Sequence, residues 1–98
     1  MPYSFRNFDA DIPAVIQQMP RDFTAHEFIL KLAKRCQDRY SRALDNYANR
    51  TPFKTVHRAL ACSLYRFPQL VRRNGSVTHR QSRDIFQNPN GCSRWQRV

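Results

Sequence analysis

The spacing of the hydrophobic residues changes along this chain at Pro68. Before Pro68, apolar residues recur three and four positions apart in segments 11–19, 24–47 and 52–67, which is typical of amphipathic helices. After it, β-forming residues surround turn-forming pairs, which is typical of strands. A chain of 98 residues supports one hydrophobic core rather than two. We therefore predict a single α+β domain over residues 1–98, with a three-helix core followed by a C-terminal β-hairpin.

Capping signals indicate where the helices begin. Thr24 and Glu27 have the spacing of a capping box, in which each side chain accepts a hydrogen bond from the backbone N–H of the other residue. Phe23 and Phe28 flank this box and can pack together as a hydrophobic staple. Two further helix starts, each with a proline in the first turn, are predicted with N-caps at Asp11 and Thr51.

The predicted helix over residues 24–47 is long for so small a domain. At about 1.5 Å per residue it would extend for roughly 35 Å. It therefore either projects from the domain or bends near Gln37 and Asp38. The outward edge of such a helix offers a contact for a protein partner or for a second copy of the chain.

Two turn sequences compete to close the predicted hairpin. The Asn-Gly pair at 74–75 is the stronger two-residue hairpin signal, and Asn-Pro-Asn-Gly at 88–91 precedes a predicted strand at 93–98. The sequence does not decide between them. Within the last strand, Arg94 and Trp95 are expected on opposite faces. We expect Trp95 to pack beneath the hairpin, and the alternative is an exposed ring that stacks on a base.

Positive charge is concentrated in the second half of the chain. The net charge is +10, yet residues 1–49 hold seven Lys and Arg against six acids, whereas residues 50–98 hold ten against Asp84 alone. Nine of those ten are Arg, whose planar guanidinium suits phosphate groups and guanine edges. This asymmetry is typical of a surface for nucleic acid or another polyanion. The alternatives are a solubility device or a site for an acidic protein or lipid.

One face of the predicted helix that begins at Pro52 collects cations without an acid. At about 100° per residue, the side opposite the apolar stripe gathers Lys54, Thr55, Arg58, Cys62, Tyr65 and Arg66. Such a face can approach phosphates and release their counterions, so that affinity falls as salt rises. Thr55 and Arg58 lie one turn into the helix and are the predicted contacts to base edges.

The order of the predicted elements resembles the winged helix-turn-helix superfamily. That order is a helix, a short extended piece at Phe23, two further helices and a basic β-hairpin. The resemblance implies that the helix before the hairpin lies in the major groove and that the hairpin, the wing, reaches the backbone or the minor groove. By position, Pro52–Arg66 would be the recognition helix and Thr78–Arg97 would contain the wing.

We therefore predict a non-enzymatic nucleic-acid-binding protein that acts as a regulator or accessory factor, with duplex DNA favoured over RNA. The arginines beyond the helix are expected to position the protein rather than to specify sequence. Each residue of the set could instead be an ordinary solvated side chain. The predicted contacts are Lys54, Thr55, Arg58, Arg66, Arg72, Arg73, Arg80, Arg83, Arg94 and Arg97.

Catalytic and metal sites have weaker support in the sequence. A small basic nuclease would use His79 with Arg80, Arg83 and Asp84, but no paired carboxylates accompany them. The three histidines and three cysteines lack the close spacing of zinc ligands, so no metal or other cofactor is expected. His57 falls within an apolar stripe and is expected to be a hydrogen-bonded core residue.

The setting of the chain can also be predicted. Its first residues lack the apolar region of a signal peptide, and no stretch approaches the roughly 18 apolar residues of a membrane span. An odd number of widely spaced cysteines favours a reduced, cytoplasmic setting. The competing function from another class is an adaptor that docks an acidic protein through the cationic half of the chain.

Overall fold

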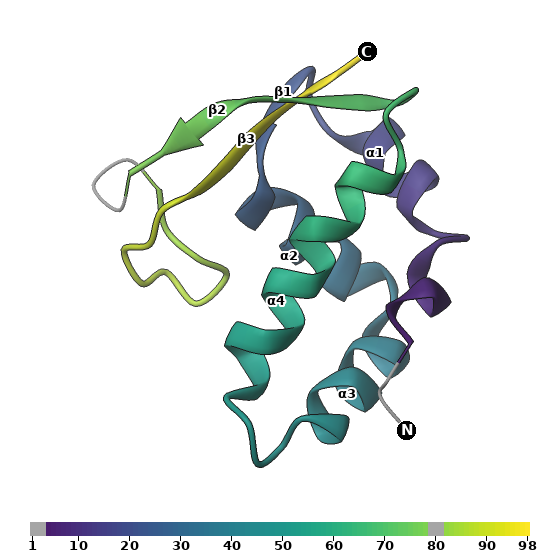
Figure 1. Cartoon of the computed structure of the whole chain (residues 1–98), viewed down its shortest axis with the longest axis vertical. Coiled ribbons are helices and arrows are strands. Elements are labelled where there is room, and N and C mark those ends of the chain that lie inside the picture. The colour runs from purple at the N-terminus through teal and green to yellow at the C-terminus, as the bar shows by residue number, and fades with distance from the viewer. Residues whose placement is uncertain (1–3, 79–81) are drawn as a thin grey trace.

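The computed structural model describes residues 4–78 and 82–98, which form a set of helices packed against a small sheet (Figure 1). Helices fill the first two thirds of the chain, and two adjacent antiparallel strands end it, so the predicted α+β class is confirmed. The elements, with η for a 3₁₀ helix, are η1 Phe5–Phe8, α1 Ile12–Gln18, β1 Asp22–Thr24, α2 Ala25–Arg35, α3 Gln37–Asn46, α4 Pro52–Cys62, η2 Ser63–Arg66, β2 Val71–Val77 and β3 Cys92–Arg97.

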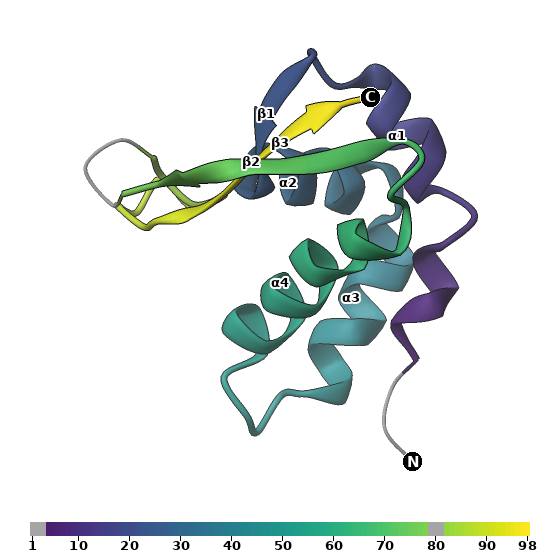
Figure 2. The same cartoon turned by 45° about the horizontal axis from the view of Figure 1, so that its top comes forward.

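The sheet is antiparallel and has the order β1-β3-β2, so the last strand of the chain is its central strand. Trp95 on β3 lies opposite Phe23 on β1 and Arg73 on β2. The short strand that precedes α2 thereby joins the C-terminal hairpin. Figure 2 shows the three strands above α2, α3 and α4.

The inner face of the sheet closes the hydrophobic core. Phe23, Val71 and Trp95 are all buried there, and they join a cluster that includes Phe28 and Leu60 from the helices. Trp95 is only 2% exposed, and its indole Nε1 donates to the Ser93 hydroxyl at 2.8 Å. The prediction that Trp95 packs beneath the hairpin is confirmed.

Arg94, the neighbour of Trp95, is exposed on the other face of β3. Successive residues of a strand alternate between the two faces, so one large aromatic side chain in the core fixes its neighbour outside. The predicted placement of Arg94 and Trp95 on opposite faces is confirmed.

The Asn-Gly pair at 74–75 does not close the hairpin. Arg73 pairs with Trp95 and Ser76 with Ser93, so the two residues between them form an irregularity in β2 rather than a turn. Gly75 has φ +84°, a conformation that costs glycine little, and the strand continues beyond it. Residues on both sides of the pair have pairing partners on β3. The chain therefore continues as a strand through residues 74–75 and does not turn there.

The second turn candidate, residues 88–91, is not the turn either. The chain reverses before it, at residues 84–88. There the Asp84 carboxylate accepts the backbone N–H groups of Phe86 and Asn88, at 2.9 and 3.0 Å. The backbone N–H of Asn90 then donates to the Ser82 carbonyl at 3.1 Å, so residues 88–90 are the return arm. The first strand of the hairpin begins at Val71, before Thr78, where the range that the resemblance gave for the wing starts.

The capping box that begins α2 is confirmed. The Thr24 hydroxyl accepts the Glu27 N–H at 3.2 Å, and the Glu27 carboxylate accepts the Thr24 N–H at 2.9 Å. Phe23 and Phe28 form the staple, with ring centroids 6.4 Å apart. Since Phe23 also belongs to β1, this helix start is fastened to the sheet.

The predicted continuous helix over residues 24–47 is instead two helices. The break lies at Cys36, where φ −118° and ψ 48° leave the helical region, one residue before the predicted bend. A straight helix would have been about as long as the largest dimension of the domain, 34 Å. The break turns α3 back so that its Ala43 is buried in the core.

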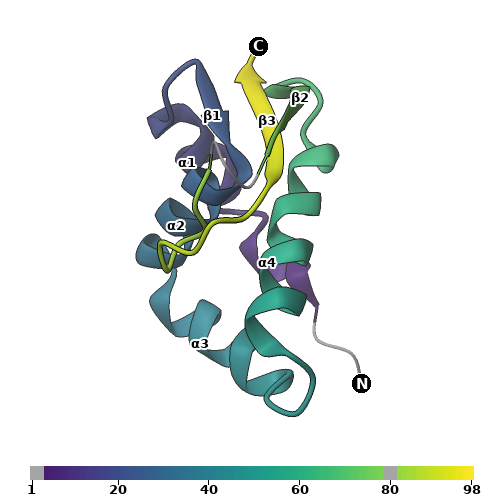
Figure 3. The same cartoon turned by 90° about the vertical axis from the view of Figure 1, so that its left-hand side faces the viewer.

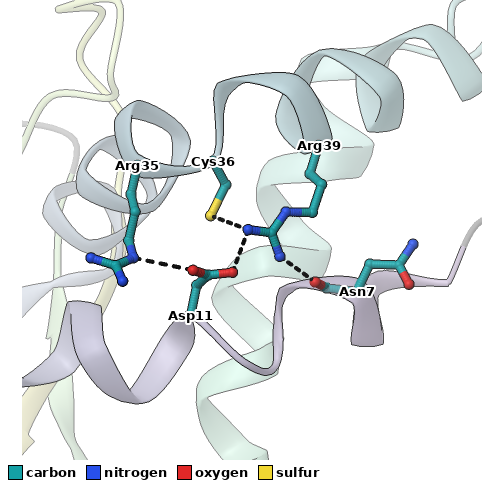
Figure 4. A network of polar contacts seen from close by, with 5 residues as sticks. All are labelled: Asn7, Asp11, Arg35, Cys36 and Arg39. Atoms are coloured by element: carbon teal, nitrogen blue, oxygen red, sulfur yellow. Dashed lines mark hydrogen bonds and ion pairs between the residues drawn. The ribbon is translucent and has the colours of Figure 1, made fainter.

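Arg35 and Arg39 stabilise the break between α2 and α3. The Asp11 carboxylate accepts from Arg35 Nε at 3.2 Å and pairs with Arg39 Nη2 at 2.5 Å (Figure 4). Arg39 also donates to the Asn7 carbonyl oxygen at 2.7 Å and to the Cys36 sulfur at 3.4 Å. This network ties the start of α1 to the break between α2 and α3.

Asp11 precedes α1 as predicted, but its side chain does not cap the helix. Charge-assisted bonds to two guanidinium groups are stronger than one bond to a backbone N–H, so the carboxylate turns to the arginines. Partial burial acts to raise the pKa of Asp11, and the hydrogen bonds from Arg35 and Arg39 outweigh it, so the pKa lies below its ordinary value of 3.8.

Replacing Asp11 with asparagine is expected to lower the free energy of unfolding by about 1–2 kcal/mol at neutral pH. The lowered pKa means that this stability is present above pH 3.8 and is lost as the pH falls through the folded-state value. Urea denaturation as a function of pH measures it. As a control, Asp45→Asn on α3 changes an exposed carboxylate that forms no ion pair with another described residue. Equal losses in both variants at neutral pH would contradict the role of the network.

Candidate nucleic-acid interface

Lys54 and Arg58 are exposed on α4, one helical turn apart. Neither forms a hydrogen bond or an ion pair with any residue in the described ranges 4–78 and 82–98. Proline at the first helical position begins this helix, and Val56 and Leu60 bury its opposite side in the core. The sequence pattern therefore places two uncompensated cations outward on a rigid element.

A third exposed cation, Arg73 of β2, lies close to the C-terminal end of the helical segment that contains Lys54 and Arg58. Tyr65 in η2 lies on nearly the same helical face as Arg58, and it is 54% exposed. Its hydroxyl accepts a hydrogen bond from Arg73 Nη1 at 2.9 Å, and its ring meets Trp95 edge-on at 4.9 Å. Arg73 on β2 is thereby held beside the C-terminal end of the helix. We call Lys54, Arg58 and Arg73 the α4–β2 basic surface.

Two predicted helix contacts have other partners. The Arg66 guanidinium forms an ion pair with the Asp9 carboxylate, which fastens η2 to the N-terminal segment. Thr55 is half-buried, and its hydroxyl donates to the Arg50 carbonyl oxygen at 2.9 Å. Both side chains therefore stabilise the ends of the helical segment 52–66.

Thr51 stands at the N-cap position of α4, but its hydroxyl does not cap the helix. It donates to the Arg50 carbonyl oxygen at 2.7 Å, and its φ of 47° lies in the left-handed region. A capping hydroxyl normally extends from a residue with β-region dihedrals, so this backbone removes the predicted cap.

Three of the remaining predicted arginines donate hydrogen bonds to other described residues. Arg72 donates to Gln96 Oε1 at 2.9 Å, and cross-strand pairing places both on the outer face of the sheet with Arg94. Arg83 donates to the Gln87 carbonyl oxygen at 3.0 Å, and Arg97 to the Gln17 carbonyl oxygen at 3.5 Å. Arg80 lies outside the described residues.

A cleft of about 490 Å³ lies beside this basic surface, between α4, the start of α2 and residues 84–93. Figure 3 shows the yellow-green segment that precedes β3 lying on the near side of α2 and α4. We call this hollow the α4 cleft. Its side chains include His26, Phe53, Lys54, His57, Arg58 and Phe86.

The aromatic part of the α4 cleft was not predicted. Phe53 continues the apolar stripe of the sequence but is 47% exposed, because it lies at the open start of α4 and packs on Phe86. Phe86 is 49% exposed, and the two ring centroids are 4.7 Å apart. Phe53 and Phe86 are far apart in the chain, so no local pattern predicts their contact. The sequence showed only that an aromatic residue, Phe86, follows Asp84 closely.

His57 packs against both of these rings. In its neutral form with the proton on Nδ1, its Nε2 accepts from the Tyr40 hydroxyl at 2.6 Å. It stacks on Tyr40 and Phe86, with centroids 5.8 and 6.0 Å away. Burial lowers the pKa of His57 below 6.5, Asp84 opposes the change and His26 adds to it. His57 is hydrogen-bonded as predicted, but it is half-buried and lines the α4 cleft instead of lying in the core.

The lowered pKa of His57 predicts a loss of stability in mild acid. Below pH 6.5 the imidazole binds a proton more readily in the unfolded chain, so the free energy of unfolding falls as the pH drops toward the folded-state pKa. His57→Gln does not titrate and keeps a polar partner for Tyr40, so its profile should be flatter between pH 7 and pH 5. Thermal melts at matched ionic strength provide the comparison, and parallel profiles would assign the acid sensitivity to other groups.

The described residues contain no cluster of three or more His, Cys, Asp or Glu side chains that could hold a metal ion. The nuclease hypothesis depends on His79 and Arg80, which lie outside the described residues. Asp84, another of its four residues, accepts two backbone N–H groups and closes a turn. Across residues 4–78 and 82–98, no helix is both long and apolar enough to cross a membrane.

Comparison with known proteins gave no match: no family model, no curated protein and no solved structure is significantly similar to this chain. Fold alone does not determine function, which depends on the chemistry of the site.

Proposed function

We propose that this chain is a non-enzymatic nucleic-acid-binding protein that places α4 against duplex DNA and acts as a regulator or accessory factor. The observation that carries the proposal is the pair Lys54 and Arg58, exposed on α4 and without a polar partner among the described residues. Cations held on a rigid helix can replace the counterions of successive phosphates. Arg73, positioned by Tyr65, extends the same surface.

The connectivity of the domain also supports the proposal. A helix, a strand, further helices and two final strands, with the first strand beside the last, follow the order of a winged helix-turn-helix domain. In that arrangement α4 would be the recognition helix, and β2 and β3 would form the wing. The additional helix α3 and the long connection from β2 to β3 are departures from the simplest arrangement.

The burial of Trp95 removes one argument for single-stranded RNA. An RNA-binding function would have gained support from an exposed tryptophan at the end of the chain, since bases stack on accessible rings. Trp95 is 2% exposed and packs in the core. The adaptor hypothesis, which relied on one long helix over residues 24–47, is weakened by the break at Cys36. We place the protein in the cytoplasm, where its cysteines would remain reduced.

A binding titration at two salt concentrations tests this function. Duplex DNA, single-stranded RNA and an acidic polypeptide are each titrated with the protein by fluorescence anisotropy. Duplex DNA is expected to bind most tightly, with a steep loss of affinity as salt rises. Equal affinity for all three ligands would contradict groove binding by α4 and leave a general polyanion site. Tight, salt-insensitive binding of the polypeptide alone would favour the adaptor.

A further inference from the structure

We propose that the α4 cleft binds one unpaired nucleotide, with its base against Phe53 and Phe86 and its phosphate on Lys54 and Arg58. The inference deepens the proposed function and rests on it where the nucleotide belongs to a bound nucleic acid. It names a chemical class of ligand for the cleft, whose aromatic side chains groove binding does not use.

The size and position of the cleft suit such a ligand. Pockets for small molecules commonly enclose about 300–1,000 Å³, and the α4 cleft encloses about 490 Å³. It lies along the same helix as the α4–β2 basic surface, and Lys54 and Arg58 line it. A strand that runs over α4 would therefore have the cleft within reach of its phosphates.

The aromatic rings supply a surface for the base. Phe53 and Phe86 each leave about half of their surface in solvent, 47% and 49%. The rings support one another edge to face, and His57 stacks beneath Phe86 at 6.0 Å. Neighbouring exposed aromatic residues are a common mark of a binding site, and nucleic-acid bases stack on such rings whatever their sequence.

Polar groups complete the cleft. Lys54 and Arg58 supply two cations for a phosphate, and neither has a polar partner in the described part of the chain. The His26 imidazole and the Asn90 side chain also line the cleft and can bond with the polar edge of a base. His26 Nδ1 is held by the Ser82 hydroxyl at 3.2 Å, which leaves Nε2 for a ligand.

Two sources of the nucleotide share this chemistry. One is an unstacked nucleotide of the bound nucleic acid, such as a single-stranded overhang. The other is a free mononucleotide that acts as an effector. A duplex with a short single-stranded overhang, a blunt duplex of the same sequence and adenosine monophosphate distinguish them.

The experiment measures the affinity of the wild type and of Phe86→Leu for these three ligands. Leucine keeps most of the apolar contact with Phe53 but removes the ring, so the fold should persist, and a thermal melt checks this. The wild type is expected to bind the overhang duplex about tenfold more tightly than the blunt duplex, the effect of roughly one stacked base. Phe86→Leu should abolish that difference and leave the blunt duplex unaffected. Phe53→Leu is a second variant with the same expected result.

The outcomes separate the two proposals. Binding of adenosine monophosphate that Phe86→Leu abolishes would identify a free nucleotide as the ligand and support the inference. Salt-dependent binding of the blunt duplex, with no overhang advantage and no mononucleotide binding, would overturn the nucleotide site and leave the proposed function standing. If the blunt duplex does not bind while the overhang duplex or the mononucleotide does, the proposed function is contradicted and the nucleotide site stands. An equal loss for blunt and overhang duplexes in both variants would also overturn the site.

Discussion

The double variant Lys54→Ala/Arg58→Ala is expected to bind duplex DNA about ten- to a hundredfold more weakly than the wild type at moderate salt. Each lost phosphate contact removes the release of roughly one counterion, so the slope of log affinity against log salt should fall in magnitude by about two. Both side chains are exposed on α4, and removing them opens no cavity in the core. The fold should therefore be unaffected, and anisotropy titrations at several salt concentrations measure both effects.

A matched variant separates a local contact from the loss of net charge. Lys34→Ala/Arg42→Ala also removes two positive charges, from exposed positions on α2 and α3. General electrostatic attraction would make the two double variants equally weak. If α4 is the docking helix, the Lys34/Arg42 variant should lose less than about threefold in affinity. Equal losses and equal salt slopes would refute a specific role for α4.

Replacing Trp95 with alanine is expected to destabilise the domain by about 3–5 kcal/mol. Trp95 stands on the central strand, is 2% exposed and contacts Tyr65 edge-on at 4.9 Å. Its loss would leave a large cavity between the sheet and the helices. A domain of this size has a total stability of about 5–15 kcal/mol, so a substantial share of the molecules could unfold. Urea denaturation followed by circular dichroism measures the change.

Two milder variants keep this prediction testable if Trp95→Ala does not fold. Trp95→Phe retains an aromatic ring and should lose about 1–2 kcal/mol. Arg94→Ala removes an exposed side chain from the same strand and should change stability by less than about 0.5 kcal/mol. A loss in Trp95→Phe no larger than that in Arg94→Ala would contradict the role of Trp95 as a core residue.

Features that depend on neighbouring residues were predicted well. The Thr24 capping box joins two side chains three positions apart, so the residues that form it can be read directly from the chain. The placement of Trp95 and Arg94 follows from strand alternation, and the buried stripe of α4 follows from the helical period. Lys54 and Arg58 were found in the same way, since the surface opposite a buried stripe is exposed.

Local patterns failed where distant contacts compete with them. Asp11 has the sequence context of an N-cap, but Arg35 and Arg39 take its carboxylate. The Asn-Gly pair at 74–75 has the strongest turn signal, yet β3 pairs with the residues on both sides of it. In each case a partner brought by tertiary packing offered a stronger interaction than the local one.

The sequence alone determined the α+β class, the start of α2, the face of the last strand and the basic side of α4, because each depends on side-chain periodicity or on residues within one helical turn. Only the tertiary structure decided which of the described cations have partners within the domain. Arg66 and Asp9 are 57 positions apart, yet they pair, and the turn at Asp84 brings Phe86 to Phe53. Charge and hydrophobicity can be read from a sequence, whereas the partner of each side chain depends on which elements meet in space.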